Sequence, residues 1–217
     1  MTAPAVHLHD VTYHSSARFT LRVPALTLGP GVTAVLGPNG CGKTTLLRIV
    51  ATVLAPTSGL LTVAGNPVAD ASLVGIRRVI GYLPQDDSVP RRLTAFDHVD
   101  LVAVMRELDA DPRRRRAVVH RALRDVGLTD LAGERCGRLS GGQRRRVALA
   151  AALAGEATML VLDEPDVHLD REHLDQLGVL LRNRAAQATI VVATHDEAWA
   201  ATVADRTIRL ASGRLSD

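Results

Sequence analysis

The sequence is poor in aromatic side chains and in cysteine. Only 2% of its 217 residues are Phe, Trp or Tyr, so a platform of stacked rings for single-stranded nucleic acid is not expected. Cys41 and Cys136 stand in dissimilar contexts without metal-ligand spacing, which disfavours a disulfide framework and a zinc site. No apolar run approaches the roughly 20 residues that cross a bilayer, and residues 1–14 lack the apolar core of a signal peptide. We therefore expect a cytosolic chain that needs another chain to span any membrane.

The charge balance is only mildly basic. Lys and Arg number 26 against 23 Asp and Glu, for a formal charge of +3, and nearly all of the cations are arginine. The two arginine clusters, Arg113–Arg116 and Arg144–Arg146, are interpreted as solvated helix faces. Contacts with lipid headgroups or with a partner chain are the alternatives.

Hydrophobic periodicity indicates one α/β core with an inserted helical part. Strand patterns appear at 6–13, 18–23, 31–37, 59–65, 158–165, 189–195 and 206–213. Helical patterns appear at 43–54, 94–108, 112–127, 141–155, 171–185 and 196–204. The second helix of the insert places one set of side chains on one side: Val118, Val119, Ala122, Leu123 and Val126. The very apolar later strands, which alternate with helices, predict a mainly parallel sheet that is buried on both faces.

A phosphate-binding loop follows the third strand pattern. The stretch GPNGCGKT matches G-x-x-x-x-G-K-[ST] at Gly37, Gly42, Lys43 and Thr44, with a strand before it and a helix after it. Glycines let backbone N–H groups approach phosphate oxygens at a helix N-terminus. Lys43 is predicted to reach the β- and γ-phosphates, and the Thr44 hydroxyl to bind magnesium.

A pair of carboxylates ends a buried strand further along the chain. In MLVLDEP, Asp163 is predicted to join the magnesium shell, and Glu164 to lie beside the γ-phosphate. A carboxylate in that place orients and deprotonates the attacking water. The loop and the acidic pair together predict a nucleotide-hydrolysing site.

With the stretch LSGGQ at residues 139–143, the chain resembles the nucleotide-binding subunits of ATP-binding cassette (ABC) transporters. The resemblance covers nearly the whole chain, with each motif in family order. It implies a P-loop NTPase (RecA-like) core at 1–85 and 155–217 that carries an N-terminal antiparallel β subdomain. A helical subdomain at about 86–154 would carry the signature sequence, and 1–217 would be a single ATPase domain.

The resemblance also assigns residues to ATP and Mg²⁺. Glu164, His195 and Gln85 are the expected catalytic residues, and Thr44, Gln85 and Asp163 are the expected metal ligands. The nucleotide-binding set comprises Tyr13 for adenine stacking, Gly37, Pro38, Asn39, Gly40, Cys41, Gly42, Lys43, Thr44, Thr45, Ser140, Gly141, Gly142, Gln143 and Asp170. In the family two cassettes pack head to tail, so the signature of one subunit contacts the γ-phosphate held by the other.

Two departures from the family pattern are visible. After Glu164 the family usually has PTSALD, whereas this chain has PDVHLD, so Asp166, Val167 and His168 replace a small polar stretch. That loop crosses the dimer interface in the family, and the coupling between the two sites is expected to differ. Cys41 stands in the phosphate loop where the family has a small residue.

These features imply a cytosolic ATPase on the inner face of the membrane that drives a separate permease. The short C-terminus resembles small exporter-type cassettes, so we expect export. A soluble cassette ATPase that acts on nucleic acid or ribosomes is one alternative, and a non-catalytic regulatory cassette is another. The cargo and the choice between homodimer and heterodimer stay open.

Overall fold

The computed structural model describes residues 5–16, 19–86, 89–155 and 157–216. The strands within these ranges form one mixed sheet of ten strands, in the order β5-β4-β1-β2-β10-β9-β3-β8-β7-β6. Their bounds are β1 Val6–Ser16, β2 Phe19–Leu28, β3 Gly31–Leu36, β4 Ser58–Val63, β5 Asn66–Pro67, β6 Ile80–Leu83, β7 Met159–Asp163, β8 Thr189–Ala193, β9 Arg206–Ala211 and β10 Arg214–Ser216.

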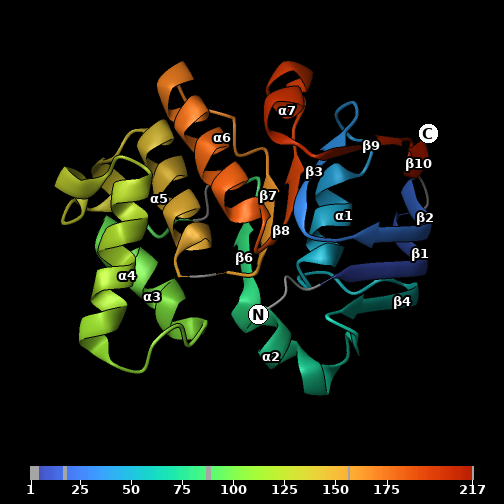
Figure 1. The fold of residues 1–217 in the computed structure, drawn as a ribbon, viewed down its shortest axis with the longest axis horizontal. Helices are drawn as coiled ribbons and strands as arrows, with labels where there is room; N and C mark the ends of the chain where they lie inside the picture. Colours follow the sequence, from blue (N-terminus) through green and yellow to red (C-terminus); the bar gives the residue numbers. More distant parts are fainter. Residues whose placement is uncertain (1–4, 17–18, 87–88, 156, 217) are drawn as a thin grey trace.

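The sheet changes character along its width. The pairs β9·β3, β3·β8, β8·β7 and β7·β6 are parallel, whereas β1 pairs with β2 and with β4 in antiparallel register. The predicted parallel core and N-terminal antiparallel part are therefore confirmed. In Figure 1 the antiparallel strands lie on one side of the molecule and the helices α3, α4 and α5 on the other.

Helices cover both faces of the parallel part. Their bounds are α1 Lys43–Val50, α2 Asp70–Val79, α3 Ala95–Met105, α4 Pro112–Asp125, α5 Gly141–Leu153, α6 Arg171–Ala185 and α7 Glu197–Val203, with short 3₁₀ turns at Thr129–Leu131 and Cys136–Arg138. Several begin at side-chain caps that the sequence supplies: Thr94 accepts from the N–H of Asp97, and Asp111 precedes Pro112 at the start of α4.

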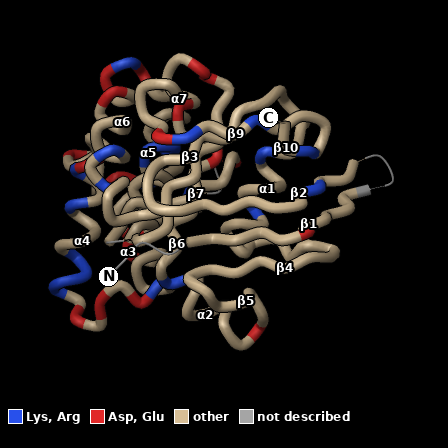
Figure 2. The backbone as a smooth tube through the Cα atoms, turned by 45° about the vertical axis from the view of Figure 1, so that its right-hand side comes forward, with Lys and Arg blue, Asp and Glu red and all other residues tan. Residues whose placement is uncertain are grey.

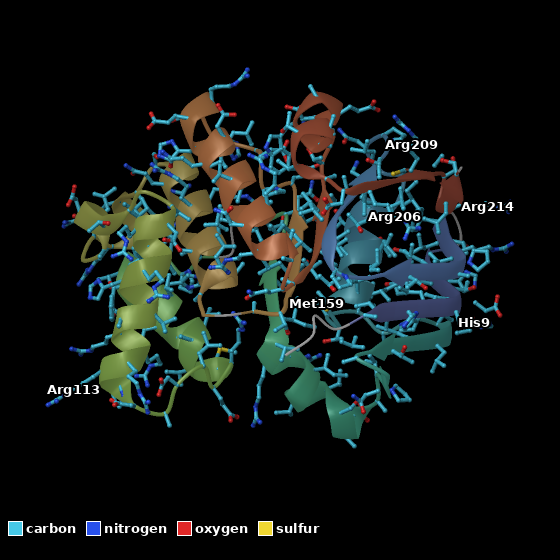
Figure 3. All side chains as sticks on the ribbon, viewed as in Figure 1. His9, Arg113, Met159, Arg206, Arg209 and Arg214 are labelled. Carbon is cyan, nitrogen blue, oxygen red and sulfur yellow. The ribbon has the colours of Figure 1, made fainter. Side chains whose placement is uncertain are left out.

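Two apolar clusters fill the space on either side of the sheet. Alternate residues of β7 divide between them: Leu160 packs with α5 and α6, and Met159, central in Figure 3, packs with α1. The cluster against α5 and α6 continues without a break into α3 and α4. One apolar core thus spans the predicted nucleotide-binding core and the predicted helical subdomain. The boundary between them at residues 86 and 155 remains a prediction.

Three local features differ from the sequence-based expectation. The helix expected to run to residue 54 ends at Val50, because Thr52 adopts a left-handed backbone with φ 59°. Helix α2 and strand β6 were not predicted; β6 has only four residues and contains Gly81. The short strands β5 and β10 were not predicted either. The five residues predicted on one side of α4 do pack on one apolar cluster, with Val118 half-buried at its edge.

Basic and acidic residues are interspersed along the backbone rather than separated into a single stripe (Figure 2). Within the cluster at the start of α4, Arg114 lies 3.3 Å from Asp109, and Arg115 lies 2.8 Å from Asp100. Arg113 projects outward from the end of the same helix (Figure 3). Arg114, whose side chain is 73% exposed, fits the interpretation of a solvated helix face, whereas the Arg115 side chain is only 17% exposed. The same interpretation is wrong for Arg145 in the second cluster, Arg144–Arg146, because Arg145 is buried with 2% exposure.

Candidate nucleotide site

The loop between β3 and α1 has the backbone of a phosphate cradle. Gly40 and Gly42 have φ of 76° and 111°, a region in which side chains are strained. At Gly37 a Cβ atom would meet the Leu210 carbonyl oxygen at 2.1 Å. These positions therefore require glycine, and the loop ends at the N-terminus of α1, where free N–H groups favour an anion.

Lys43 is the first residue of α1, and its side chain folds back over the loop. It is 5% exposed, and its Nζ donates to the carbonyl of Gly37 at 2.7 Å and to that of Pro38 at 3.3 Å. The ammonium group thus lies inside the cradle, where a phosphate oxygen is a natural competitor for its N–H groups.

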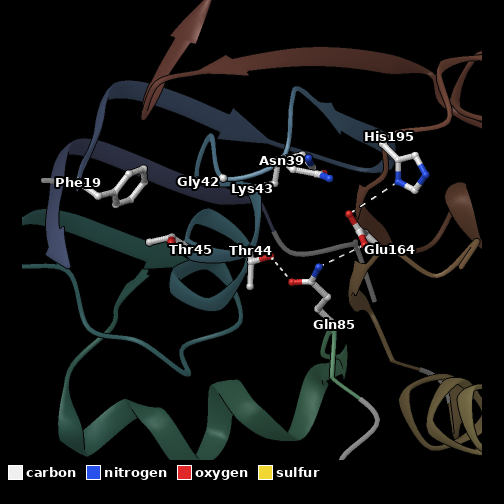
Figure 4. A pocket seen from close by; sticks show the side chains of 10 residues that line it. Phe19, Asn39, Gly42, Lys43, Thr44, Thr45, Gln85, Glu164 and His195 are labelled. Carbon is white, nitrogen blue, oxygen red and sulfur yellow. Dashed lines mark hydrogen bonds and ion pairs between the residues drawn. The ribbon is translucent and has the colours of Figure 1, made fainter. Parts of the chain in front are cut away.

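A cavity of about 390 Å³ opens above this loop (Figure 4). Most of its lining was predicted from the sequence. The lining residues are Phe19, Asn39, Gly40, Gly42, Lys43, Thr44, Thr45, Gln85, Glu164 and His195. Gly37, Pro38 and Cys41 belong to the same loop but do not line the cavity.

A chain of polar contacts crosses the cavity from α1 to the end of β8 (Figure 4). The Thr44 hydroxyl donates to Gln85 Oε1 at 3.1 Å, and Gln85 Nε2 donates to Glu164 Oε2 at 3.3 Å. His195 Nδ1 lies 3.8 Å from Glu164 Oε1. The structure therefore brings together the three predicted catalytic residues, Gln85, Glu164 and His195, and joins them to Thr44.

Asp163 is the last residue of β7 and directly precedes Glu164. It is 0% exposed, and neither carboxylate oxygen has a hydrogen-bond partner among the residues that the structure describes. Burial raises the pKa of the Asp163 carboxyl above its ordinary value, and the charge of Glu164 adds to the rise, whereas the Thr44 hydroxyl and the Arg145 guanidinium oppose it. Two free carboxylate oxygens beside a threonine hydroxyl suit a hard divalent cation such as Mg²⁺.

The signature stretch lies outside the cavity lining. Ser140 is exposed and caps α5: its Oγ accepts from the Gln143 N–H at 3.2 Å, and Gln143 Oε1 accepts from the Ser140 N–H at 2.8 Å. A Cβ on Gly142 would approach the His168 carbonyl oxygen at 2.8 Å, whereas a Cβ on Gly141 meets nothing closer than 4.0 Å. The α5 N-terminus therefore offers backbone N–H groups of the kind that favour an anion, and its residues do not line the cavity at the phosphate loop.

Asp170 and Tyr13 also lie outside the lining. Asp170 caps α6 by accepting from the N–H of His173 at 3.0 Å. Tyr13 is half-buried and packs on the apolar cluster of the antiparallel strands. The aromatic ring in the cavity is Phe19, whose Cζ would lie 2.8 Å from a Cβ on Gly42. The sequence motifs did not predict Phe19 as a cavity residue. Phe19 begins β2, opposite Ser16 of β1, and this pairing is visible only in the structure.

Comparison with known proteins agrees with this geometry. The family model described as ABC transporter matches residues 22–167. The macrolide export ATP-binding/permease protein MacB 1/2 of Paracoccus denitrificans is 38% identical over 98% of this chain, which spans 33% of that protein. The lipoprotein-releasing system ATP-binding protein LolD of Bacteroides fragilis is 34% identical over 97% of this chain and 99% of its own length.

Solved structures match over the same extent. The dimeric structure of MJ0796, a bacterial ABC transporter cassette, is 28% identical with a TM-score of 0.86, and covers 98% of this chain and 97% of its own. The same cassette is also known as a dimer in a post-hydrolysis state bound to ADP and Pi, with a TM-score of 0.83. The fold is thus that of a P-loop NTPase cassette, and the chain is an ATP-binding ATPase that belongs to the ABC transporter family.

Proposed function

We propose that this chain powers transport, in the export direction, through a separate membrane permease by ATP-driven head-to-tail dimerisation. One observation carries the proposal: the cavity around Lys43 and the exposed anion site at Ser140 lie apart on the same chain. Two copies related by a two-fold axis can bring each signature to the other's cavity. ATP then bridges the copies, and its hydrolysis releases them.

Several side chains of the cavity, together with Asp163, are assigned to the phosphates, to Mg²⁺ or to hydrolysis. The loop N–H groups and Lys43 hold the β- and γ-phosphates, and Thr45 reaches the α-phosphate. Thr44, Gln85 and Asp163 would hold Mg²⁺, which when bound neutralises charge on the phosphate oxygens. The two carboxylate oxygens of Asp163, which have no hydrogen-bond partner within the described part of the chain, support this assignment.

Glu164 is the proposed general base. It is 14% exposed, and Gln85 and His195 approach its two carboxylate oxygens, which fixes the direction of the carboxylate. The base takes a proton from water as the water oxygen bonds to the γ-phosphorus, and the bond to the β,γ-bridging oxygen breaks to leave ADP and phosphate. His195, 60% exposed, is placed to contact the γ-phosphate.

The facing copy supplies the remaining contacts. Ser140, Gly141, Gly142 and Gln143 offer a hydroxyl, backbone N–H groups and the positive end of the α5 dipole to the γ-phosphate. Asp170, at the start of α6, is assigned to the same interface. We propose a homodimer, since one chain provides both half-sites.

An exposed apolar patch supports a permease partner. Leu101, Val104 and Met105 lie on one face of α3 and are 46%, 47% and 73% exposed, and Val74 on α2 is 62% exposed. An ion pair of 2.7 Å between Arg78 and Glu107 joins the ends of these two helices. The helices of the described ranges do not include one long and apolar enough to cross a membrane.

The proposal is tested by isolating the tagged chain from native membranes in mild detergent. We expect a multi-span membrane protein to co-purify, and Leu101→Asp with Met105→Asp to lose it. Val179→Asp on α6 is the control, because Val179 is 49% exposed and lies on another helix. Retention by the α3 variant would contradict this docking surface. ATPase activity stimulated by nucleic acid, with no membrane partner, would contradict the transport function itself.

A further inference from the structure

Arg145 is a buried arginine on α5, five residues from the signature serine. It is 2% exposed. Its Nη1 donates to the carbonyls of Pro84 and Gln85, the latter at 3.2 Å. Its Nη2 donates to the carbonyls of Asp163 and Glu164, the latter at 2.9 Å. One guanidinium therefore binds the two segments that carry Gln85 and Glu164, two of the polar residues that line the cavity.

These two segments leave the sheet side by side. Strands β6 and β7 are parallel neighbours with Leu83 opposite Leu162, so Gln85 and Glu164 follow adjacent strand ends. The planar guanidinium presents its N–H groups in a fixed fork, and such a group fixes the spacing of the acceptors on its two sides. Arg145, which belongs to α5, thereby sets the distance between the backbone segments at Gln85 and Glu164.

The backbone of Glu164 needs to be held in place. Its φ is 48°, in the left-handed region that a non-glycine residue adopts only under constraint. Three hydrogen bonds constrain it: its N–H donates to the Ala193 carbonyl at 2.8 Å, and its own carbonyl accepts from Arg145 at 2.9 Å and from the Val167 N–H at 3.3 Å. A change at Arg145 removes the only one of the three that comes from a side chain.

We propose that Arg145 is a positioning residue that fixes Gln85 and Glu164 relative to each other and links the signature helix to the water-activating carboxylate. Arg145 does not line the cavity and does not touch the reacting atoms. It binds the backbone carbonyls of Gln85 and Glu164, and so positions the two side chains that hydrogen-bond to each other. The inference rests on the proposed roles of these two residues.

The test compares Arg145→Lys and Arg145→Gln with a matched control, Arg106→Lys. Lys keeps the charge but lacks the fork, and Gln keeps an amide donor without charge. Arg106 is also buried, at 8% exposure, and donates to the carbonyls of Ala154 and Arg78, away from the cavity. The measurements are kcat, ATP affinity by equilibrium binding and the unfolding temperature of each variant.

We expect both Arg145 variants to lower kcat by about 10- to 100-fold, because a misplacement of about 1 Å costs on that order, while ATP affinity changes by less than about 3-fold. Arg106→Lys should lower the unfolding temperature without this loss of kcat. A kcat near wild type in the Arg145 variants overturns the proposal, and so does an equal loss of kcat in Arg106→Lys. Should one Arg145 variant not fold, the other decides.

A double-mutant cycle with Gln85→Ala separates positioning from a general structural role. If Arg145 acts through the pair, Arg145→Lys should reduce kcat less in the Gln85→Ala background than in the wild type. Additive effects would overturn the proposal. If Glu164→Gln is fully active, the assignment of Glu164 as the base is wrong. If Glu164→Gln is inactive while Arg145→Lys has a normal kcat, only the inference about Arg145 is wrong.

Discussion

Gln85 Nε2 donates to Glu164 Oε2 at 3.3 Å, although 79 positions separate the two residues in the sequence. The contact directs one oxygen of the carboxylate toward the metal-binding side of the cavity, where Thr44 also bonds to Gln85. The other oxygen faces His195. A carboxylate held from two sides meets the geometric requirement for a general base near the γ-phosphate.

We predict that Glu164→Gln binds ATP with unchanged affinity, because the amide keeps the shape of the side chain. Turnover should fall by about 10²- to 10⁴-fold, the usual contribution of a general base. ATP should then hold the variant as a dimer, which gel filtration with and without ATP can measure. Glu172→Gln, exposed on α6, serves as the control. Turnover near the wild-type rate in Glu164→Gln would remove Glu164 as the base.

We predict that Phe19 is the aromatic residue that stacks on the bound base. Stacking of a base on an aromatic ring contributes about 1–3 kcal/mol, so Phe19→Ala should weaken ATP binding by about 5- to 150-fold. Tyr13→Ala is the matched comparison, since Tyr13 lies outside the lining of the cavity. Binding of a fluorescent ATP analogue measures both. A larger loss in Tyr13→Ala would restore the role that the sequence assigned to Tyr13.

We predict that the departure at Asp166 costs stability at neutral pH. Burial raises the pKa of its carboxyl, and Oδ1 has no hydrogen-bond partner among the described residues. The pKa of Asp166 is therefore higher in the folded than in the unfolded protein. As the pH rises from the unfolded-state pKa through the folded-state pKa, the free energy of unfolding falls, and the loss persists at neutral pH. Asp166→Asn, which removes the charge, should therefore be more stable than the wild type at about pH 7.

This advantage should shrink on acidification, as the wild-type carboxyl, whose pKa is raised by burial, takes up its proton. Urea unfolding at several pH values gives the free energies, and Asp175→Asn on the surface of α6 is the control. An advantage that grows on acidification would have the opposite sign and would contradict the destabilising charge of the half-buried Asp166.

The sequence analysis found the parallel strands because long apolar runs such as residues 159–163 and 189–193 read as buried strands on their own. It missed β6, because four residues that include a glycine give no such pattern, and α2, which buries only Ile76. The motifs located Lys43, Gln85, Glu164 and His195. Arg145 could not be found in this way, since its partners are backbone carbonyls that only the folded sheet brings together.

The central claim is that each ATP is enclosed by the Lys43 cavity of one copy and the Ser140 site of another. Lys43→Ala disables the cavity. Gly141→Asp disables the signature, because a Cβ has room there and the added carboxylate repels a phosphate. Each variant alone should be inactive. In a mixed dimer, one site carries both defects and the other carries neither.

The most direct measurement is therefore the ATPase activity of an equal mixture of the two variants. Random pairing makes about half of the dimers mixed, each with one intact site of two, so we predict recovery of about a quarter of the wild-type activity. The recovery should disappear on dilution, as the dimers separate. An inactive mixture at dimer-forming concentration, or Gly141→Asp fully active alone, would contradict the shared site.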